Sequence, residues 1–139
     1  MMMLANRSMP ASIVIPTLPY ADVTVAAAWL ERVFGFSVRL TIGDHRVQIV
    51  TPEGGDIVLT RASGDVAHAL IMVRVADVDA VHTHADAEGA EVRGAPQNQP
   101  YGERQFTAID CGGHAWTFSQ SIAEVPPESW GGVTGPGFR

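Results

Sequence analysis

The fold of this chain is decided by the stretch Pro100-Tyr-Gly-Glu-Arg-Gln-Phe-Thr-Ala-Ile-Asp-Cys-Gly-Gly-His-Ala-Trp-Thr-Phe-Ser-Gln120. Its pattern predicts a β-hairpin with strands at 104–109 and 115–120. The turn falls at 110–113, because an Asp and two glycines supply the side-chain hydrogen bond and the positive φ angles that tight turns need. Phe106, Trp116 and Phe118 are aromatic residues of the kind that pack on a half-buried sheet.

The residues before this hairpin predict strands and helices in a repeated order. The first half indicates a strand at 12–18, a helix at 25–34 that Gly35 ends, and strands at 36–41, 45–50 and 56–60. Asp22 or Thr24 is expected to cap the first helix. The second half indicates a strand at 68–75, a helix at 77–89, a short strand at 90–94, a polar loop at 97–102 and then the hairpin.

Both halves therefore follow the order β-α-β-β-β, and they also share a short motif. Tyr20-Ala-Asp-Val23 in the first half matches Val75-Ala-Asp-Val78 in the second, each where a strand leads into its helix. A spacing of about 55–60 residues between such matches indicates an internal duplication.

The hairpin resembles the last hairpin of the vicinal-oxygen-chelate superfamily. This superfamily includes glyoxalase I, the extradiol dioxygenases, the fosfomycin-resistance enzymes and the bleomycin-resistance proteins. The shared pattern is Tyr or Trp followed by Gly, an aromatic residue, and then Asp-Pro-x-Gly-x-x-Trp; here Cys111 replaces the Pro. The resemblance covers about residues 13–120. It implies an α+β fold of two tandem βαβββ modules, whose curved mixed sheets surround a cavity.

The predicted organisation has four parts. We expect a disordered leader at 1–11, a first module at 12–62, a second module at 63–122, and a tail at 123–139 that is rich in Pro and Gly. Trp130 lies in this tail, and a large aromatic side chain there is expected to pack on the body or on a partner chain.

Composition argues against several classes of partner. The chain is 46% hydrophobic and 17% charged, which is typical of a globular domain. Its net charge is −6 and its pI is about 5.2, so we expect neither nucleic acid nor an anionic membrane as a partner. The longest apolar runs are too short to span a bilayer. Cys111 is the only cysteine, which suits a reducing cytoplasm, and we expect a cytoplasmic protein.

The resemblance also implies where a metal would be held. Many members of the superfamily bind a divalent ion through His, Gln or Glu on the first and last strands of each module. The corresponding residues of this chain are Ile15, Val58, Leu70 and Thr117. Because aliphatic side chains donate no ligand, we predict no metal and no other cofactor. His68 shares a strand face with Leu70 and would become a ligand if the alignment slipped, but one His does not make a site.

The same positions define the expected ligand surface. Alternate residues of the curved strands should line the cavity with aliphatic side chains, a few hydroxyls and one His. These side chains would otherwise simply fill the space as core. At the cavity mouth, Arg104 is expected to bind a carboxylate or phosphate, or else to form an ion pair with Glu103 or Asp110. The predicted substrate-binding residues are Ile15, Thr17, Val58, His68, Leu70, Met72, Tyr101, Arg104, Phe106 and Thr117, and the same face would also carry Ile13, Thr60, Ala115 and Ser119.

Three functions follow from these observations. The first is a metal-free protein that binds a small apolar or aromatic molecule, similar to the bleomycin-resistance proteins, which sequester a drug without chemistry. The second is a metal-dependent lyase, isomerase or dioxygenase of the same superfamily. The third is a subunit whose partner surface is its function. In each case the apolar sheet faces indicate a homodimer.

Overall fold

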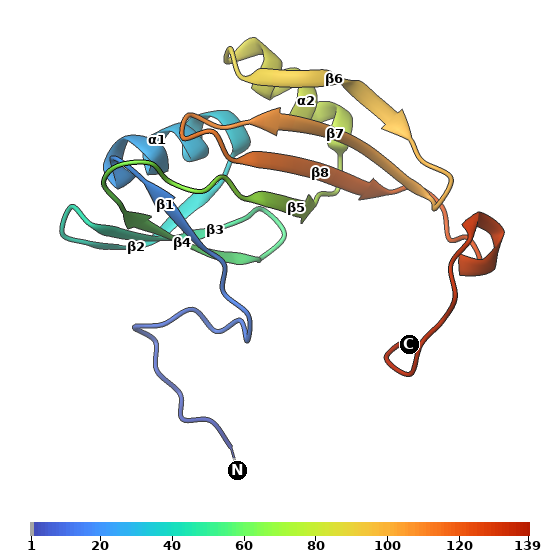
Figure 1. Ribbon diagram of the computed structural model, residues 1–139, viewed down its shortest axis with the longest axis horizontal. Helices are drawn as coiled ribbons and strands as arrows, with labels where there is room; N and C mark the ends of the chain where they lie inside the picture. The colour runs from blue at the N-terminus through green and yellow to red at the C-terminus, as the bar shows by residue number, and fades with distance from the viewer. Residues whose placement is uncertain (1) are drawn as a thin grey trace.

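The chain forms two four-stranded sheets, each with one helix (Figure 1). The computed structural model describes residues 2–139. Sheet A has the order β1-β4-β3-β2, with β1 Thr17–Tyr20, β2 Ser37–Ile42, β3 Arg46–Val50 and β4 Asp56–Arg61. Sheet B has the order β5-β8-β7-β6, with β5 Leu70–Arg74, β6 Glu91–Asn98, β7 Glu103–Ile109 and β8 Ala115–Ser121. The pairs β1–β4 and β5–β8 are parallel and the others are antiparallel. The predicted fold of two βαβββ repeats is confirmed.

The repeated Ala-Asp-Val motif starts both helices. Helix α1, Val23–Phe34, begins after Asp22, whose carboxylate accepts a hydrogen bond from the Val25 N–H at 3.1 Å. Helix α2, Val78–Ala87, begins after Asp77, which accepts from the Ala80 N–H at the same distance. An aspartate at this position satisfies a free N–H of the first turn. The duplication is therefore a repeat of local capping chemistry as well as of topology.

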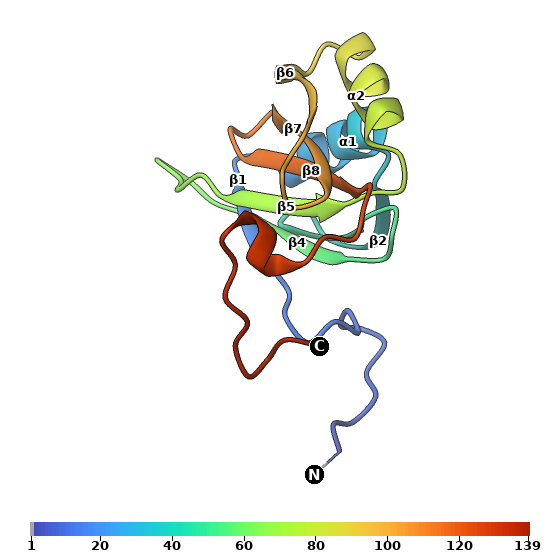
Figure 2. The same ribbon diagram turned by 90° about the vertical axis from the view of Figure 1, so that its right-hand side faces the viewer.

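The two repeats share one hydrophobic core. Phe34 and Phe36 of the first repeat contact Trp116 and Phe118 of the hairpin, with ring centroids 4.8–6.5 Å apart. Such tilted and edge-on aromatic contacts stabilise beyond the area that they bury. Figures 1 and 2 show α1 and α2 on the same side of the molecule, where they contact one another.

The histidines of α2 take part in this packing. His84 Nε2 lies 2.8 Å from the carbonyl oxygen of Arg32 in α1, and the ring of His82 packs edge-on against Phe106 at 5.0 Å. They are therefore contacts of α2 with α1 and with sheet B.

The hairpin turn also joins the repeats. His114 is fully buried, and its Nε2 lies 2.8 Å from the carbonyl oxygen of Pro19, while its Nδ1 accepts a hydrogen bond from the Ala69 N–H at 2.9 Å. Both ring nitrogens are satisfied, so a polar ring is accommodated inside the core. The first repeat is thereby fixed to the strand that opens the second.

Two strand boundaries differ from the prediction by more than two residues. The first strand begins at Thr17 rather than at residue 12, because pairing with β4 starts at Thr17. Before Thr17, the carbonyl oxygen of Pro16 accepts a hydrogen bond from the Val58 N–H of β4. Strand β6 continues to Asn98, through part of the predicted loop. It lies at the edge of sheet B and has an irregularity between Arg93 and Gln97, which lets a polar segment containing Pro96 remain in the strand.

The C-terminal tail meets the start of β7. Its 3-10 helix, Pro127–Trp130, brings the Trp130 ring to 5.3 Å from that of Tyr101. Trp130 therefore packs on the body of the same chain. Within residues 2–139, no helix is long and apolar enough to cross a membrane.

Candidate functional site

Sheet B exposes the face that points away from the helices, which we call its outer face. Along β8, Trp116 and Phe118 are fully buried in the core, so Thr117 lies on the outer face. In register with Thr117 are Thr107 of β7 and Met72 of β5. Met72 and the neighbouring Leu70 are 64% and 72% exposed. Large aliphatic side chains this exposed on one strand form an apolar surface that a ligand or another chain would cover.

A line of hydrogen bonds borders this apolar surface. The Tyr101 hydroxyl donates to Gln105 Oε1 at 2.9 Å, and Gln105 Nε2 donates to the Ser119 hydroxyl at 3.0 Å. The Ser119 hydroxyl donates in turn to the Glu103 carboxylate at 2.7 Å. This line ends in a carboxylate that accepts hydrogen bonds and donates none.

Glu103 is ionised at neutral pH. Desolvation raises the pKa of its carboxyl, but hydrogen bonds from Ser121 and Ser119 and the positive charge of Arg74 outweigh it and hold the pKa below its usual range. The outer face therefore offers a negative charge beside an apolar surface.

A pocket lies on this face, and we call it the sheet B pocket. Its volume is ≈ 360 Å³, and it has one exposed methionine among several amide and hydroxyl side chains. The lining residues are Met72, Arg93, Ala95, Gln97, Gln99, Gln105, Phe106, Thr107 and Thr117. Sequence reasoning missed the three glutamines. Gln97 of β6 and Gln105 of β7 are register partners, but residues 97–102 were expected to form a loop, so this pairing was not predicted.

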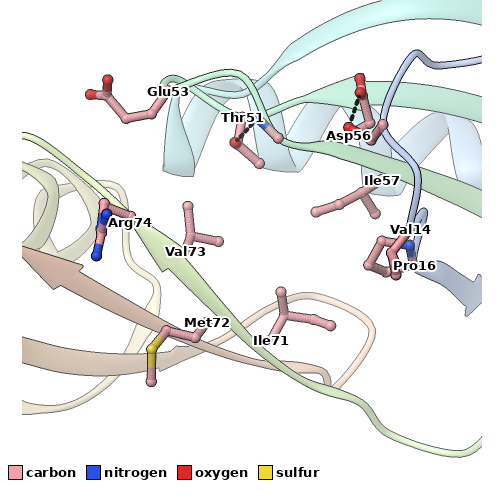
Figure 3. A pocket seen from close by; sticks show the side chains of 12 residues that line it. Val14, Pro16, Thr51, Glu53, Asp56, Ile57, Ile71, Met72, Val73 and Arg74 are labelled. Carbon is pink, nitrogen blue, oxygen red and sulfur yellow. Dashed lines mark hydrogen bonds between the residues drawn. The ribbon is translucent and has the colours of Figure 1, made fainter. Parts of the chain in front are cut away.

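A second pocket lies between the start of β4 and strand β5, and we call it the junction pocket. It has a volume of ≈ 380 Å³ and an apolar floor that includes Ile57 and Val73. Figure 3 shows Ile71 and Val73 on the side of β5 that faces Ile57, with Met72 on the other side. Because Met72 lines both pockets, β5 separates two adjoining hollows.

The structure brings together some of the predicted site residues. Met72 and Thr117 line the sheet B pocket, with Leu70 on the same strand as Met72. Tyr101 borders the same face through its bond to Gln105. Thr17 and Val58 are register partners in sheet A, and Ile15 lies between two residues that line the junction pocket. These residues belong to the other repeat and not to the sheet B pocket.

His68 lies at the hairpin turn. Its ring centroid is 5.9 Å from that of His114, and a Cβ placed on Gly113 would lie 2.7 Å from its Nε2. It lines neither pocket. Cys111 in the same turn is exposed, and desolvation of its thiol, followed by the nearby charge of Asp110, raises its pKa. A raised pKa disfavours the reactive thiolate.

The prediction for Arg104 is wrong in its geometry. Arg104 belongs to β7. Its guanidinium donates hydrogen bonds to the Asp79 carboxylate of α2 at 3.0–3.2 Å and to Asn98 Oδ1 at 3.0 Å. It therefore faces the helix side of sheet B, and its ion pair is with Asp79 rather than with Glu103 or Asp110. Phe106 also lines the sheet B pocket, but its ring is buried on the helix side, where it stacks on Phe118 at 5.3 Å. The reason is strand alternation: with Gln105 and Thr107 outside, residues 104 and 106 point inward.

The residues at the implied metal positions do not fit a metal. Ile15, Val58 and Leu70 carry no donor atom, and the hydroxyl of Thr117 is bonded to that of Thr107 at 2.8 Å. Elsewhere among residues 2–139, no group of three His, Cys, Asp or Glu side chains could hold an ion.

Comparison with known proteins agrees with this architecture. The family described as Glyoxalase/Bleomycin resistance protein/Dioxygenase superfamily matches residues 12–118. No curated protein sequence matches the chain.

Three solved structures are similar to the chain. TioX from Micromonospora sp. ML1 is 30% identical with a TM-score of 0.70, covering 81% of this chain and 100% of that one. A bleomycin resistance determinant encoded on the transposon Tn5 is 17% identical with a TM-score of 0.68, covering 81% and 100%. Lactoylglutathione lyase from Agrobacterium tumefaciens is 20% identical with a TM-score of 0.65, covering 81% and 96%. With two βαβββ repeats and a family match over most of its length, the chain belongs to the glyoxalase/bleomycin resistance protein/dioxygenase superfamily.

Proposed function

We propose that this protein binds a small apolar or aromatic molecule without a metal and holds it without chemistry, as a resistance or sequestration protein does. The observation that carries the proposal is the outer face of sheet B, where exposed Leu70 and Met72 lie beside a line of hydrogen-bonding side chains. Ligand sites are typically concave, mostly apolar, and supplied with a few polar groups that fix orientation.

The dimensions and chemistry of the site support this proposal. The two pockets adjoining β5 have volumes of ≈ 360 and ≈ 380 Å³, within the range of about 300–1,000 Å³ that is usual for small molecules. The amides of Gln97, Gln99 and Gln105 both donate and accept hydrogen bonds. A planar molecule with carbonyl or hydroxyl groups at its rim would suit such a lining. The similar fold of the Tn5 bleomycin resistance determinant lends support.

The proposal also covers where the protein acts and what it assembles with. We propose a cytoplasmic location, because the chain has a single cysteine and so cannot form an internal disulfide. We also propose that the protein acts as a homodimer and that it binds neither nucleic acid nor a membrane.

Thermal stabilisation by a panel of aromatic antibiotics and metabolites would test the proposal, because a ligand that binds only the folded state raises the melting temperature. The affinity of any hit is then measured by calorimetry for wild type and three variants. We expect Met72→Ala and Gln105→Ala to weaken binding by about tenfold, the equivalent of 1.4 kcal/mol.

Arg104→Ala is the matched control, because Arg104 adjoins Gln105 in the strand but faces α2. It should bind within about twofold of wild type. A larger loss for Arg104→Ala than for Gln105→Ala would place the ligand on the other side of the sheet. A panel in which no compound stabilises the protein would count against ligand binding itself.

A further inference from the structure

The N-terminal segment, residues 7–12, is bound to sheet A. Gln48 Nε2 of β3 donates to the carbonyl oxygen of Ser8 at 2.9 Å, and Arg39 Nη2 of β2 donates to that of Arg7 at 2.7 Å. Arg39 also donates to Gln48 Oε1, so the two side chains hold the segment as a unit. At the end of the segment, the Ser12 hydroxyl donates to the Asp56 carboxylate at 2.5 Å.

These contacts place the segment on the outer face of sheet A. Val47 and Ile49 of β3 point into the core with α1, so Gln48 points the other way. Figures 1 and 2 show the N-terminal segment on the side of sheet A that is opposite to α1. The segment predicted to be a disordered leader thus includes residues that contact the sheet, and Pro10 within it is buried.

The outer faces of the two sheets differ in exposure. Gln48 and Val58 are register partners in sheet A, and each is 4% exposed. The partners at the matching place in sheet B, Thr107 and Thr117, are only partly buried. The covered face is therefore the one that the N-terminal segment reaches, and the open face is the one without such a segment.

The segment is held in a way that permits its release. It contributes main-chain carbonyls to Gln48 and Arg39 and has no strand pairing with sheet A. A pocket of ≈ 610 Å³ is lined by residues of the N-terminal stretch, and Arg39 is its one lining residue from sheet A. Segments with few buried contacts open at low free-energy cost.

We propose that residues 7–12 form a strap over the outer face of sheet A, and that a ligand reaches Val58 only when the strap is displaced. The strap proposal rests on the proposed function in one respect, because it treats the outer face of sheet A as part of the same ligand-binding surface as the outer face of sheet B. While the strap is in place, a ligand can reach only the outer face of sheet B. When the strap is displaced, the ligand can also reach the outer face of sheet A.

The first test measures the strap itself, in the full-length chain. A nitroxide label on Met9→Cys, in a Cys111→Ser background, should broaden the amide signals of Gln48 and Val58 more than those of Thr107 and Thr117. Pro10→Asp should abolish this difference, because burying the new carboxylate is unfavourable and releases the strap. Ser8→Asp is the matched control, because it adds the same charge at an exposed position and should leave the difference intact.

The second test measures the uncovered face with the aromatic probe 8-anilinonaphthalene-1-sulfonate. Its affinity should rise at least about fivefold in Pro10→Asp and remain unchanged in Ser8→Asp, with both variants keeping a cooperative unfolding transition. Ser12→Ala removes the hydrogen bond to Asp56 and should raise the probe affinity by a smaller factor. If Pro10→Asp does not fold, Ser12→Ala is the variant that tests release of the strap.

Equal broadening of both sheets, or probe affinity that is the same in every variant, would overturn the strap. If the probe affinity rises when the strap is released but no molecule of the antibiotic panel stabilises the protein, the strap proposal stands and the proposed function is wrong. The two proposals thus fail separately.

Discussion

The Tyr20 hydroxyl donates a hydrogen bond of 2.5 Å to Oδ2 of Asp110, joining the end of β1 to the hairpin turn across 90 residues of sequence. The same carboxylate accepts from the main-chain N–H groups of Gly112 and His114 and from Trp116 Nε1, each at 2.9 Å. One buried aspartate therefore forms the turn, anchors the core tryptophan and joins the two repeats. Gly112 is required beside it, since a Cβ there would lie 2.6 Å from the Tyr20 ring.

Replacing Tyr20 by Phe should lower the free energy of unfolding by about 1.5–3 kcal/mol, the range for a hydrogen bond to a charged group. The buried carboxylate of Asp110 would lose its contact with the first repeat. Urea titration of both proteins measures the change. Tyr101→Phe is the matched control, because its hydroxyl bonds the neutral Gln105, and it should cost about 1 kcal/mol or less. Equal losses in the two variants would contradict a special role for Asp110.

Stability should fall at alkaline pH because of Tyr20. Burial, followed by the charge of Asp110 and the hydrogen bond to it, raises the pKa of Tyr20 in the folded chain well above its usual range. Above a pH of about 10, the unfolded chain releases the phenolic proton and the folded chain keeps it. The stabilisation is complete below that pH and is lost above it, by about 1.4 kcal/mol per pH unit.

Urea titrations between pH 8 and 11 check this slope. Tyr20→Phe lacks the ionising group, so its stability should decline less steeply, and the gap between the proteins should narrow as pH rises. Tyr101 is present in both and cancels. Parallel curves would show that Tyr20 ionises equally in the folded and unfolded chains.

The purified protein should bind no stoichiometric metal, because Ile15, Val58 and Leu70 offer no donor atom. The test uses protein made without a His-tag, incubated with Zn, Ni, Mn or Fe(II) and then desalted. We expect far less than one ion per chain by elemental analysis. A full equivalent that survives desalting would require ligands outside the implied positions and would favour the metal-dependent enzyme.

The protein should be a homodimer at tens of micromolar, because the exposed apolar residues Val14, Leu70 and Met72 leave surface to cover. Light scattering after size exclusion measures the mass. Leu70→Asp should shift the protein toward monomer, whereas Val133→Asp, at a still more exposed site in the tail, should not. A monomer mass for wild type would refute the prediction.

Local chemistry in the sequence was sufficient to predict the order of strands and helices, and the family resemblance supplied the arrangement of the two modules. The Asp and Gly residues of the hairpin turn and the repeated Ala-Asp-Val motif were readable from local sequence, whereas Ile15, Val58 and Leu70 were identified through the family resemblance. Caps and turns depend on residues a few positions apart, so they can be recognised without knowing what packs against them. The repeat of these signals then indicated the internal duplication.

The face that each hairpin residue presents was decided only by the tertiary structure. Arg104 and Gln105 are neighbours of similar polarity, yet one bonds Asp79 of α2 and the other lies on the outer face. A shift of one residue in strand register exchanges the two faces, and the loop-like sequence before β7 does not reveal that register.

The contacts between distant segments likewise required the folded chain. Tyr20 meets Asp110, and Gln48 meets the Ser8 carbonyl, across 90 and 40 residues. Neither contact has a sequence signal, because each forms only after the two repeats pack together or the N-terminal segment folds back on sheet A. The sequence by itself determined which elements form, whereas the tertiary structure decided which surfaces they cover and which they leave open, because burial depends on partners that the local sequence does not contain.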